Sequence, residues 1–195
     1  MTELEKAIQH FKKNDPILFK IYKTGSIKLL KPIKKEQYFI SLCQSIIYQQ
    51  LSGKVAGTIY SRFEKLFSKK EITPRKLLNL SDDKLQSVGL SHQKVKYLRN
   101  LAQHVLDKSL DFNNFKNLTN EEIFNQLIQV KGIGPWTAEM FLMFSMARSD
   151  VFSRGDLGIR NGMEKLYGKE LSDKQIERWS PYKTYACLLL WRSVE

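Results

Sequence analysis

The sequence predicts an all-α protein. Apolar residues recur at the three- to four-residue spacing of amphipathic helices along most of the 195-residue chain. No segment combines strict alternation of apolar and polar residues with a hairpin turn, which is the pattern expected of antiparallel strands. With 42% hydrophobic residues the chain can bury a sizeable core, and no Pro-, Gly- or Ser-rich linker divides it. We therefore expect a single domain over residues 1–195, with two small helical lobes that share an interface as the alternative.

Residues typical of helix ends place the predicted helices of the first half. Thr2 and Asp15 are suitable N-caps, and Pro16 fits a first helical turn. Gly89 is typical of a helix C-terminus. The basic stretch 24–35 is irregular. The predicted helices span residues 3–14, 16–22, 36–52, 53–67, 73–80, 81–89 and 91–108.

In the second half, two apolar helices flank a turn of sequence VKGIG. Thr119 and Glu122 form a capping-box pattern at the start of the helix that leads into this turn. A second apolar helix follows from Pro135, and the acidic loop SRGD comes after it. Further helices are expected at 157–168, 172–180 and 181–194.

The turn is a candidate anion site. Gly132 and Gly134 can adopt backbone conformations that other residues avoid, so the chain can reverse tightly and approach a ligand closely. Pro135 suits the first turn of the following helix. The amides of Gly132, Gly134, Trp136 and Thr137 would then point outward at a helix N-terminus, where a phosphate group binds well.

Charge and cysteine content restrict the function classes. The chain has 32 Lys and Arg against 20 Asp and Glu, a net charge of +12, and a pI of about 9.6, which favours a polyanionic partner: nucleic acid first and a membrane surface second. No apolar run reaches the ~18 residues of a membrane span, so we expect a soluble, intracellular protein. Cys43 and Cys187 are too few for an iron–sulfur cluster or a four-thiolate zinc site and are expected in the core.

The segment LIQVKGIGPWTAEMF resembles the helix–hairpin–helix of the helix–hairpin–helix (HhH-GPD) DNA glycosylase superfamily. The loop VFSRGD and the C-terminal RWSPYKTYACLLLW resemble its 3-methyladenine DNA glycosylase II group, and the resemblance extends over about residues 36–192. It implies two packed helical lobes with a cleft between them and no N-terminal β domain. The hairpin motif would occupy about residues 121–147, and the N- and C-terminal helices would build the other lobe.

The resemblance also implies an enzyme: a monofunctional DNA glycosylase that flips alkylated purines, such as 3-methyladenine or 7-methylguanine, out of duplex DNA and hydrolyses the N-glycosidic bond in base excision repair. Superfamily members with lyase activity resemble one another in a lysine at the position of Trp136, so no lyase activity is expected. The alternatives are a non-catalytic helix–hairpin–helix DNA-binding protein and a glycosylase for deaminated or mismatched bases.

Asp156 matches the catalytic aspartate of the resembling group. A fixed carboxylate stabilises the positive charge that develops on the sugar and orients or deprotonates water. A purely structural alternative is that Asp156 caps the helix LGIRNGMEKL, and both roles can hold together. Asp150 is the nearest other carboxylate and the weaker candidate catalyst.

Aromatic rings are suited to holding an electron-deficient base. Trp136 and Trp191 match the pocket tryptophans of the group, although a single tryptophan in a helical pattern is usually a core residue. Tyr48 is a secondary pocket candidate. Met140 stands where the group offers an aromatic residue, whereas Trp179 is interpreted as structural.

The segment YQQLS resembles the group's wedge, which fills the gap left by a flipped base. The second glutamine, Gln50, is the expected wedge, with Leu51 as the apolar alternative and a simple polar helix end as the structural one. Arg154 would contact phosphate or hold the loop before Asp156. The remaining expected phosphate contacts are Lys131, which replaces a common proline, Gly132, Gly134 and Thr137.

We expect no obligatory cofactor. Family hairpins hold a structural monovalent cation through main-chain carbonyls, here those of Ile128, Val130 and Ile133. The expected partner is double-stranded DNA with damaged bases, bound by a monomer without a membrane. The expected location is the cytoplasm, at the nucleoid, in a bacterium, or the nucleus in a eukaryote.

Overall fold

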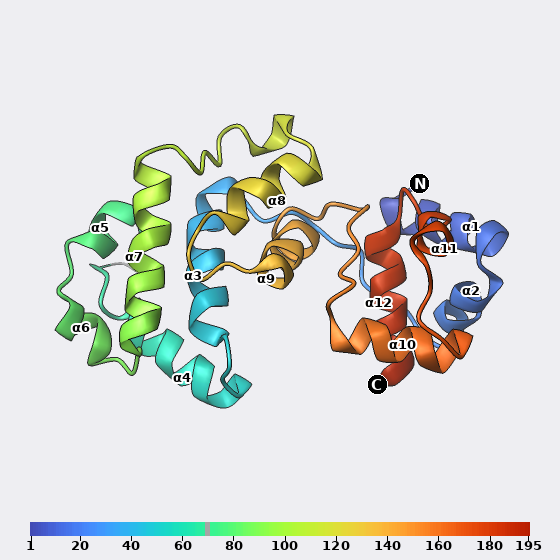
Figure 1. Ribbon diagram of the computed structural model, residues 1–195, viewed down its shortest axis with the longest axis horizontal. Helices are drawn as coiled ribbons and strands as arrows, with labels where there is room; N and C mark the ends of the chain where they lie inside the picture. Colours follow the sequence, from blue (N-terminus) through green and yellow to red (C-terminus); the bar gives the residue numbers. More distant parts are fainter. Residues whose placement is uncertain (69–70) are drawn as a thin grey trace. The chain divides into compact units, whose positions relative to one another are not determined.

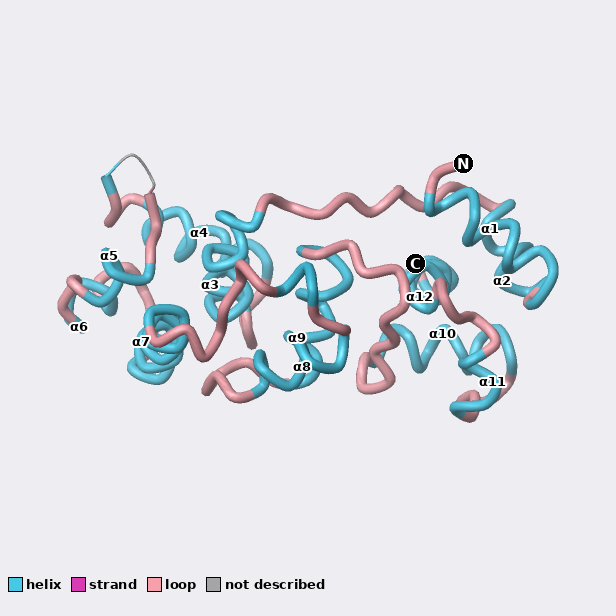
Figure 2. Tube along the Cα trace, turned by 90° about the horizontal axis from the view of Figure 1, so that it is seen from above, coloured by secondary structure: helices cyan, strands magenta, loops and turns pink. Residues whose placement is uncertain are grey.

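The computed structural model describes residues 1–68 and 71–195, and this part of the chain contains helices and loops but no strand (Figures 1 and 2). The predicted all-α class is therefore confirmed. None of the helices in the described ranges is long and apolar enough to cross a membrane. The elements, in order, are α1 (Glu3–Asn14), α2 (Pro16–Lys23), η1 (Lys35–Gln37), α3 (Tyr38–Tyr48), α4 (Gly53–Glu64), α5 (Pro74–Leu78), α6 (Asp82–Gln86), α7 (His92–Leu106), η3 (Phe115–Asn117), α8 (Asn120–Ile128), α9 (Pro135–Met140), η4 (Phe141–Ser145), α10 (Leu157–Tyr167), α11 (Asp173–Glu177) and α12 (Lys183–Val194).

The chain divides into two compact units. The hairpin unit is continuous and comprises residues 33–141, whereas the terminal unit combines residues 1–32 with residues 142–195. Cys43 lies in the hairpin unit and Cys187 in the terminal unit, and both side chains are fully buried. Burial raises the pKa of the Cys43 thiol, so this group is an inert core residue rather than a nucleophile.

In the hairpin unit, α3 packs on α4 and α7, and α7 also packs on α5 and α6 (Figure 1). The faces that meet are apolar: Leu42 and Ile46 of α3, like Leu98 and Leu101 of α7, have no exposed surface. Helices α8 and α9 form the predicted helix–hairpin–helix beside this core. The core therefore supports both the hairpin and the end of α3.

In the terminal unit, α10 packs on α12, and α12 also packs on α2. The crossing of α10 and α12 depends on Gly162, because a Cβ atom there would lie 2.6 Å from the backbone oxygen of Leu190. Any side chain at this position would force the helices apart. This close crossing fixes the start of α10 relative to the end of α12.

Two helix boundaries differ from the prediction. The third helix ends at Tyr48 rather than near residue 52, since Gln50 has a positive φ of 59° that no helix can contain. The apolar helix after the hairpin is also not uniform, because the six-residue α9 passes into the π-helical turn η4. Both irregularities lie next to candidate site residues, where strained or irregular backbone is most often found.

Candidate active site

The hairpin turn is shaped by two glycines with different tasks. Gly132 has a φ of 96°, and a Cβ atom there would lie 2.3 Å from Cγ of Tyr97. Both its conformation and the tight approach of α7 therefore require glycine. Gly134 is the N-cap of α9, with an extended backbone (φ −89°) and open space around it, so the expectation that it needs a conformation reserved for glycine is wrong. Pro135 opens the first turn as predicted.

Side chains from neighbouring helices hold this turn. The Lys131 amide donates to Oδ1 of Asn100 at 2.7 Å, and the Gln49 side-chain amide donates to the Gly132 carbonyl at 2.8 Å. Lys131 and Gly134 are exposed, whereas Thr137 is buried. An anion at this turn would therefore meet main-chain amides and the Lys131 ammonium, while the Thr137 side chain faces inward.

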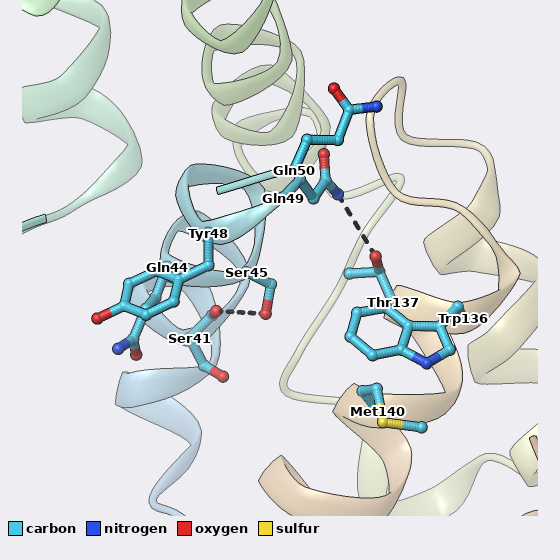
Figure 3. Close-up of a pocket in the computed structure, with 9 residues that line it drawn as sticks. All are labelled: Ser41, Gln44, Ser45, Tyr48, Gln49, Gln50, Trp136, Thr137 and Met140. Carbon is cyan, nitrogen blue, oxygen red and sulfur yellow. Dashed lines mark hydrogen bonds between the residues drawn. The ribbon is translucent and has the colours of Figure 1, made fainter. Parts of the chain in front are cut away.

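An open pocket of about 360 Å³ lies beside the hairpin in the same unit. Five predicted site residues line it: Tyr48, Gln50, Trp136, Thr137 and Met140. Figure 3 shows the Trp136 indole extending from α9 toward α3, with Met140 one turn further along α9. Trp136 is 50% exposed, so it is not the core tryptophan of the structural alternative. The pocket volume lies within the range of small-ligand sites.

Sequence reasoning missed part of this pocket. Its α3 wall is polar and includes Ser41, Gln44 and Ser45 (Figure 3). With Tyr48 they occupy positions 41, 44, 45 and 48, the i, i+3, i+4, i+7 pattern of one helix face, on a helix that is otherwise apolar. A polar stripe on a strongly apolar helix is the signal that could have found them.

The candidate catalytic carboxylate belongs to the terminal unit. Asp156 is the N-cap of α10, and its Oδ1 accepts from the Ile159 amide at 2.9 Å, so the predicted cap is confirmed. The same oxygen accepts from Nε1 of Trp191 at 2.7 Å. A Cβ atom on Gly158 would lie 2.7 Å from Cδ1 of Trp191, so this close pairing requires glycine. Asp156 is thus held from its own helix and from α12.

Trp191 has a further partner that the sequence did not reveal. Its ring stacks on Phe144, with centroids 6.0 Å apart and planes at 26°. Phe144 is 42% exposed and belongs to the π-helical turn. The role of Trp191 that the structure supports is to position Asp156, and its predicted contact with a flipped base stays a prediction.

The loop before Asp156 is fixed by polar contacts. Arg154 forms ion pairs with Glu170 and Asp173 and donates to the Leu171 carbonyl. This corresponds to the loop-holding role of Arg154, and the expected phosphate contact gains no support from it. Asp150 accepts from the Ser180 hydroxyl at 2.7 Å and from the Lys183 amide at 3.2 Å, so it is engaged in capping α12.

If Asp156 is the catalytic carboxylate that the resemblance implies, the Trp191→Phe variant is expected to lower the rate of base release about tenfold or more. It keeps an aromatic ring against Phe144 but removes a hydrogen bond to a charged group, which is typically worth about 1.5–3 kcal/mol. Single-turnover base release would measure the effect, with binding to abasic DNA as the control. An unchanged rate would mean that Trp191 does not orient the carboxylate.

Comparisons with known proteins agree on one family. Residues 43–180 match the model of the HhH-GPD superfamily base excision DNA repair proteins. The crystal structure of DNA-3-methyladenine glycosidase from Bacillus halodurans is 36% identical, with a TM-score of 0.85 over 95% of this chain and 87% of that chain. A 3-methyladenine DNA glycosylase of Schizosaccharomyces pombe in complex with abasic DNA is 29% identical, with a TM-score of 0.81 over 95% of each chain. DNA-3-methyladenine glycosylase of Saccharomyces cerevisiae is 31% identical over 95% of this chain and 78% of its own length.

Proposed function

Because this chain belongs to the HhH-GPD superfamily of base excision DNA repair proteins, we propose that it is a monofunctional DNA glycosylase that removes alkylated purines from double-stranded DNA. The relatives named above are DNA-3-methyladenine glycosylases or glycosidases. The observation that carries the proposal is the Asp156 carboxylate, half-buried at a helix N-terminus and fixed by the Ile159 amide and the Trp191 indole.

The proposed reaction requires one carboxylate. As the N-glycosidic bond breaks, its electron pair leaves with the base and positive charge develops on the sugar. Asp156 stabilises this charge, and water adds its oxygen to C1′ while the carboxylate accepts its proton. An alkylated purine already carries a positive charge and leaves as a neutral base, so the reaction needs less acid assistance at the leaving group.

The pocket of the hairpin unit supports the choice of base. The exposed Trp136 indole offers a π face to a cationic purine, and such contacts are favourable by about 0.5–2 kcal/mol. Met140 adds a polarisable thioether, and the polar α3 wall presents amide and hydroxyl groups to a base edge. Trp136 also occupies the position at which lyase members of the superfamily have a lysine, so we propose hydrolysis without strand cleavage.

We propose that the protein binds DNA as a monomer and contacts the DNA backbone through its hairpin. We also propose that a monovalent cation stabilises the hairpin turn. Of its expected ligands, the Val130 carbonyl accepts from the Ile133 amide at 2.9 Å, which leaves a second lone pair for an ion. Ile128 and Ile133 would supply the other carbonyls. The cation would fix the turn without taking part in the chemistry.

Binding to abasic DNA is expected to weaken steeply as salt is added, because cationic side chains displace counterions from phosphates. Lys131→Ala should reduce the slope of log Kd against log salt by about one. Lys84→Ala is the charge-matched control, since α6 lies at the other end of the same unit from α9 (Figure 1). Equal slopes of log Kd against log salt for the two variants would show that Lys131 does not contact phosphate.

A panel of damaged duplexes tests the proposed substrate class. The protein should release 3-methyladenine and 7-methylguanine from methylated DNA, and it should act poorly on deaminated, mismatched or oxidised bases. Preferred release of a deaminated base would show that the protein is a DNA glycosylase for a different class of substrate. Binding to every duplex without any release would favour the non-catalytic alternative.

A further inference from the structure

Helix α7 connects the loop after α3 with the hairpin turn through residues spaced three apart. Lys94 donates from Nζ to the carbonyls of Ile47 at 2.7 Å and Gln49 at 2.8 Å, at the end of α3. One turn later, Tyr97 packs against Gly132. A further turn along, Asn100 accepts from the hairpin amide of Lys131. One face of α7 therefore holds both the segment after α3 and the hairpin.

The cationic side chain of Lys94 is partly buried. Burial lowers the pKa of its ammonium group, so its position is unfavourable for a charge unless hydrogen bonds compensate. One of the two carbonyls that it reaches, that of Ile47, lies in the last turn of α3, and the other belongs to the C-cap residue Gln49. Carbonyls at a helix C-terminus lack partners within the helix. Its neighbour on the same helix, Lys96, is exposed.

The segment held by Lys94 is strained. Gln50, the expected wedge, has a φ of 59°, which a residue other than glycine adopts only where its surroundings impose it. The loop borders an open pocket of about 210 Å³, lined by Gln49, Gln50, Leu51, Gly89, Ser91 and Lys94. Leu51 is 37% exposed, so burial of this side chain alone does not fix the loop, and the hydrogen bonds to its backbone contribute to its position.

The loop is also connected directly to the hairpin. The Gln49 side chain donates to the Gly132 carbonyl at 2.8 Å and approaches Oγ1 of Thr137 at 3.4 Å (Figure 3). Its backbone carbonyl is one of the two oxygens that Lys94 holds. A shift of this backbone would therefore move the wedge and disturb the hairpin together.

We propose that Lys94 is a positioning residue that holds the strained Gln50 loop in the conformation needed to fill the gap left by an extruded base. This inference rests on the proposed function, because a wedge is useful only to a protein that extrudes bases. Lys94 would touch neither the base nor the sugar. Its contribution would be to base extrusion rather than to hydrolysis.

The test compares Lys94→Met with Lys96→Met, which removes the same charge from the same helix. The first readout is the fluorescence of 2-aminopurine placed opposite an abasic site, which reports insertion of the wedge without any base release. Gln50→Gly, which keeps the backbone conformation accessible, defines the part of the signal that comes from the wedge. We expect Lys94→Met to lose at least two thirds of that part and Lys96→Met to keep it.

The second readout separates extrusion from chemistry. Lys94→Met should release 7-methylguanine at least tenfold more slowly than the wild type from a paired duplex, but less than threefold more slowly when the damaged base lies opposite an abasic site. In the Gln50→Gly background, Lys94→Met should have little further effect, because coupled residues are not additive. Equal slowing on both substrates, or a full wedge signal in Lys94→Met, would overturn the proposal.

Separate control experiments test whether the variants fold and whether the protein is a glycosylase at all. Thermal unfolding identifies a variant that does not fold, and Lys94→Gln then replaces Lys94→Met: its neutral amide stands on a shorter side chain than the ammonium that reaches the carbonyls of Ile47 and Gln49, so a partial loss of the wedge signal is expected. A wild-type signal in Lys94→Gln together with wild-type extrusion would overturn the proposal. If the wild-type protein releases no alkylpurine, the proposed function fails, and the 2-aminopurine signal still decides whether Lys94 positions the loop.

Discussion

Replacement of Asp156 by asparagine is expected to lower the rate of alkylpurine release by about a thousandfold, within the range reported for removing a catalytic base or an electrostatic stabiliser. Asparagine has the same shape and is an equally good N-cap. Its side-chain oxygen can still accept from the Ile159 amide and the Trp191 indole, so only the charge and the basicity are lost. Single-turnover release from methylated DNA measures the change.

Two controls accompany this variant. The thermal midpoint should stay within a few degrees of the wild-type value, because the cap of α10 is preserved. The Kd for abasic DNA should also change little. A variant that keeps its fold and releases bases at the wild-type rate would show that Asp156 is only a helix cap, which is the structural alternative raised by the sequence.

Asp15→Ala is expected to destabilise the protein by about 3–5 kcal/mol, because it leaves the indole of Trp179 and the hydroxyl of Tyr167 without their acceptor and removes the cap of α2, each worth about 1–2 kcal/mol. The Asp15 side chain is 1% exposed and pairs with Arg178 at 2.8 Å. It also accepts from the Tyr167 hydroxyl at 2.8 Å and the Trp179 indole at 2.7 Å, and it caps α2. Burial, and secondarily the Asp15 charge, raise the pKa of Tyr167, so this phenol remains a donor.

Chemical denaturation measures this loss, and Asp107→Ala, at the exposed end of α7, is the matched control. The control should change the free energy of unfolding by less than about 0.5 kcal/mol. A loss of under about 1 kcal/mol in Asp15→Ala would mean that the network adds little to stability. Trp179 belongs to this network and is fully buried, in agreement with its structural interpretation.

Local signals predicted the parts of the site that lie within a short stretch of chain. The hairpin could be predicted because Gly132, with its positive φ, and Pro135, in the first turn of α9, each meet a backbone requirement that few residues satisfy. The N-cap role of Asp156 could be predicted because the helix that follows it is plainly amphipathic. The meeting of Tyr48 with Trp136 and Met140 in one pocket required more, and it came from resemblance rather than from periodicity.

Contacts between distant residues could not be predicted from one sequence. The bond from Trp191 to Asp156 joins residues 35 positions apart, and that from Lys94 to Ile47 joins residues 47 apart. Lysine and tryptophan in a helical pattern have the same local appearance whether they serve a site or a surface. The positive φ of Gln50 was equally hidden, because the surrounding contacts impose it against the residue's own preference.

The most direct test of hydrolysis by Asp156 follows the released base and the damaged strand while the wild-type protein acts on a duplex that carries one 7-methylguanine. Free base should accumulate with time, the damaged strand should stay intact until alkali cleaves the abasic site, and borohydride should trap no covalent complex. This result is the signature of hydrolysis by a carboxylate without a lysine nucleophile. Strand breaks in the absence of alkali, a trapped complex, or no released base would contradict it.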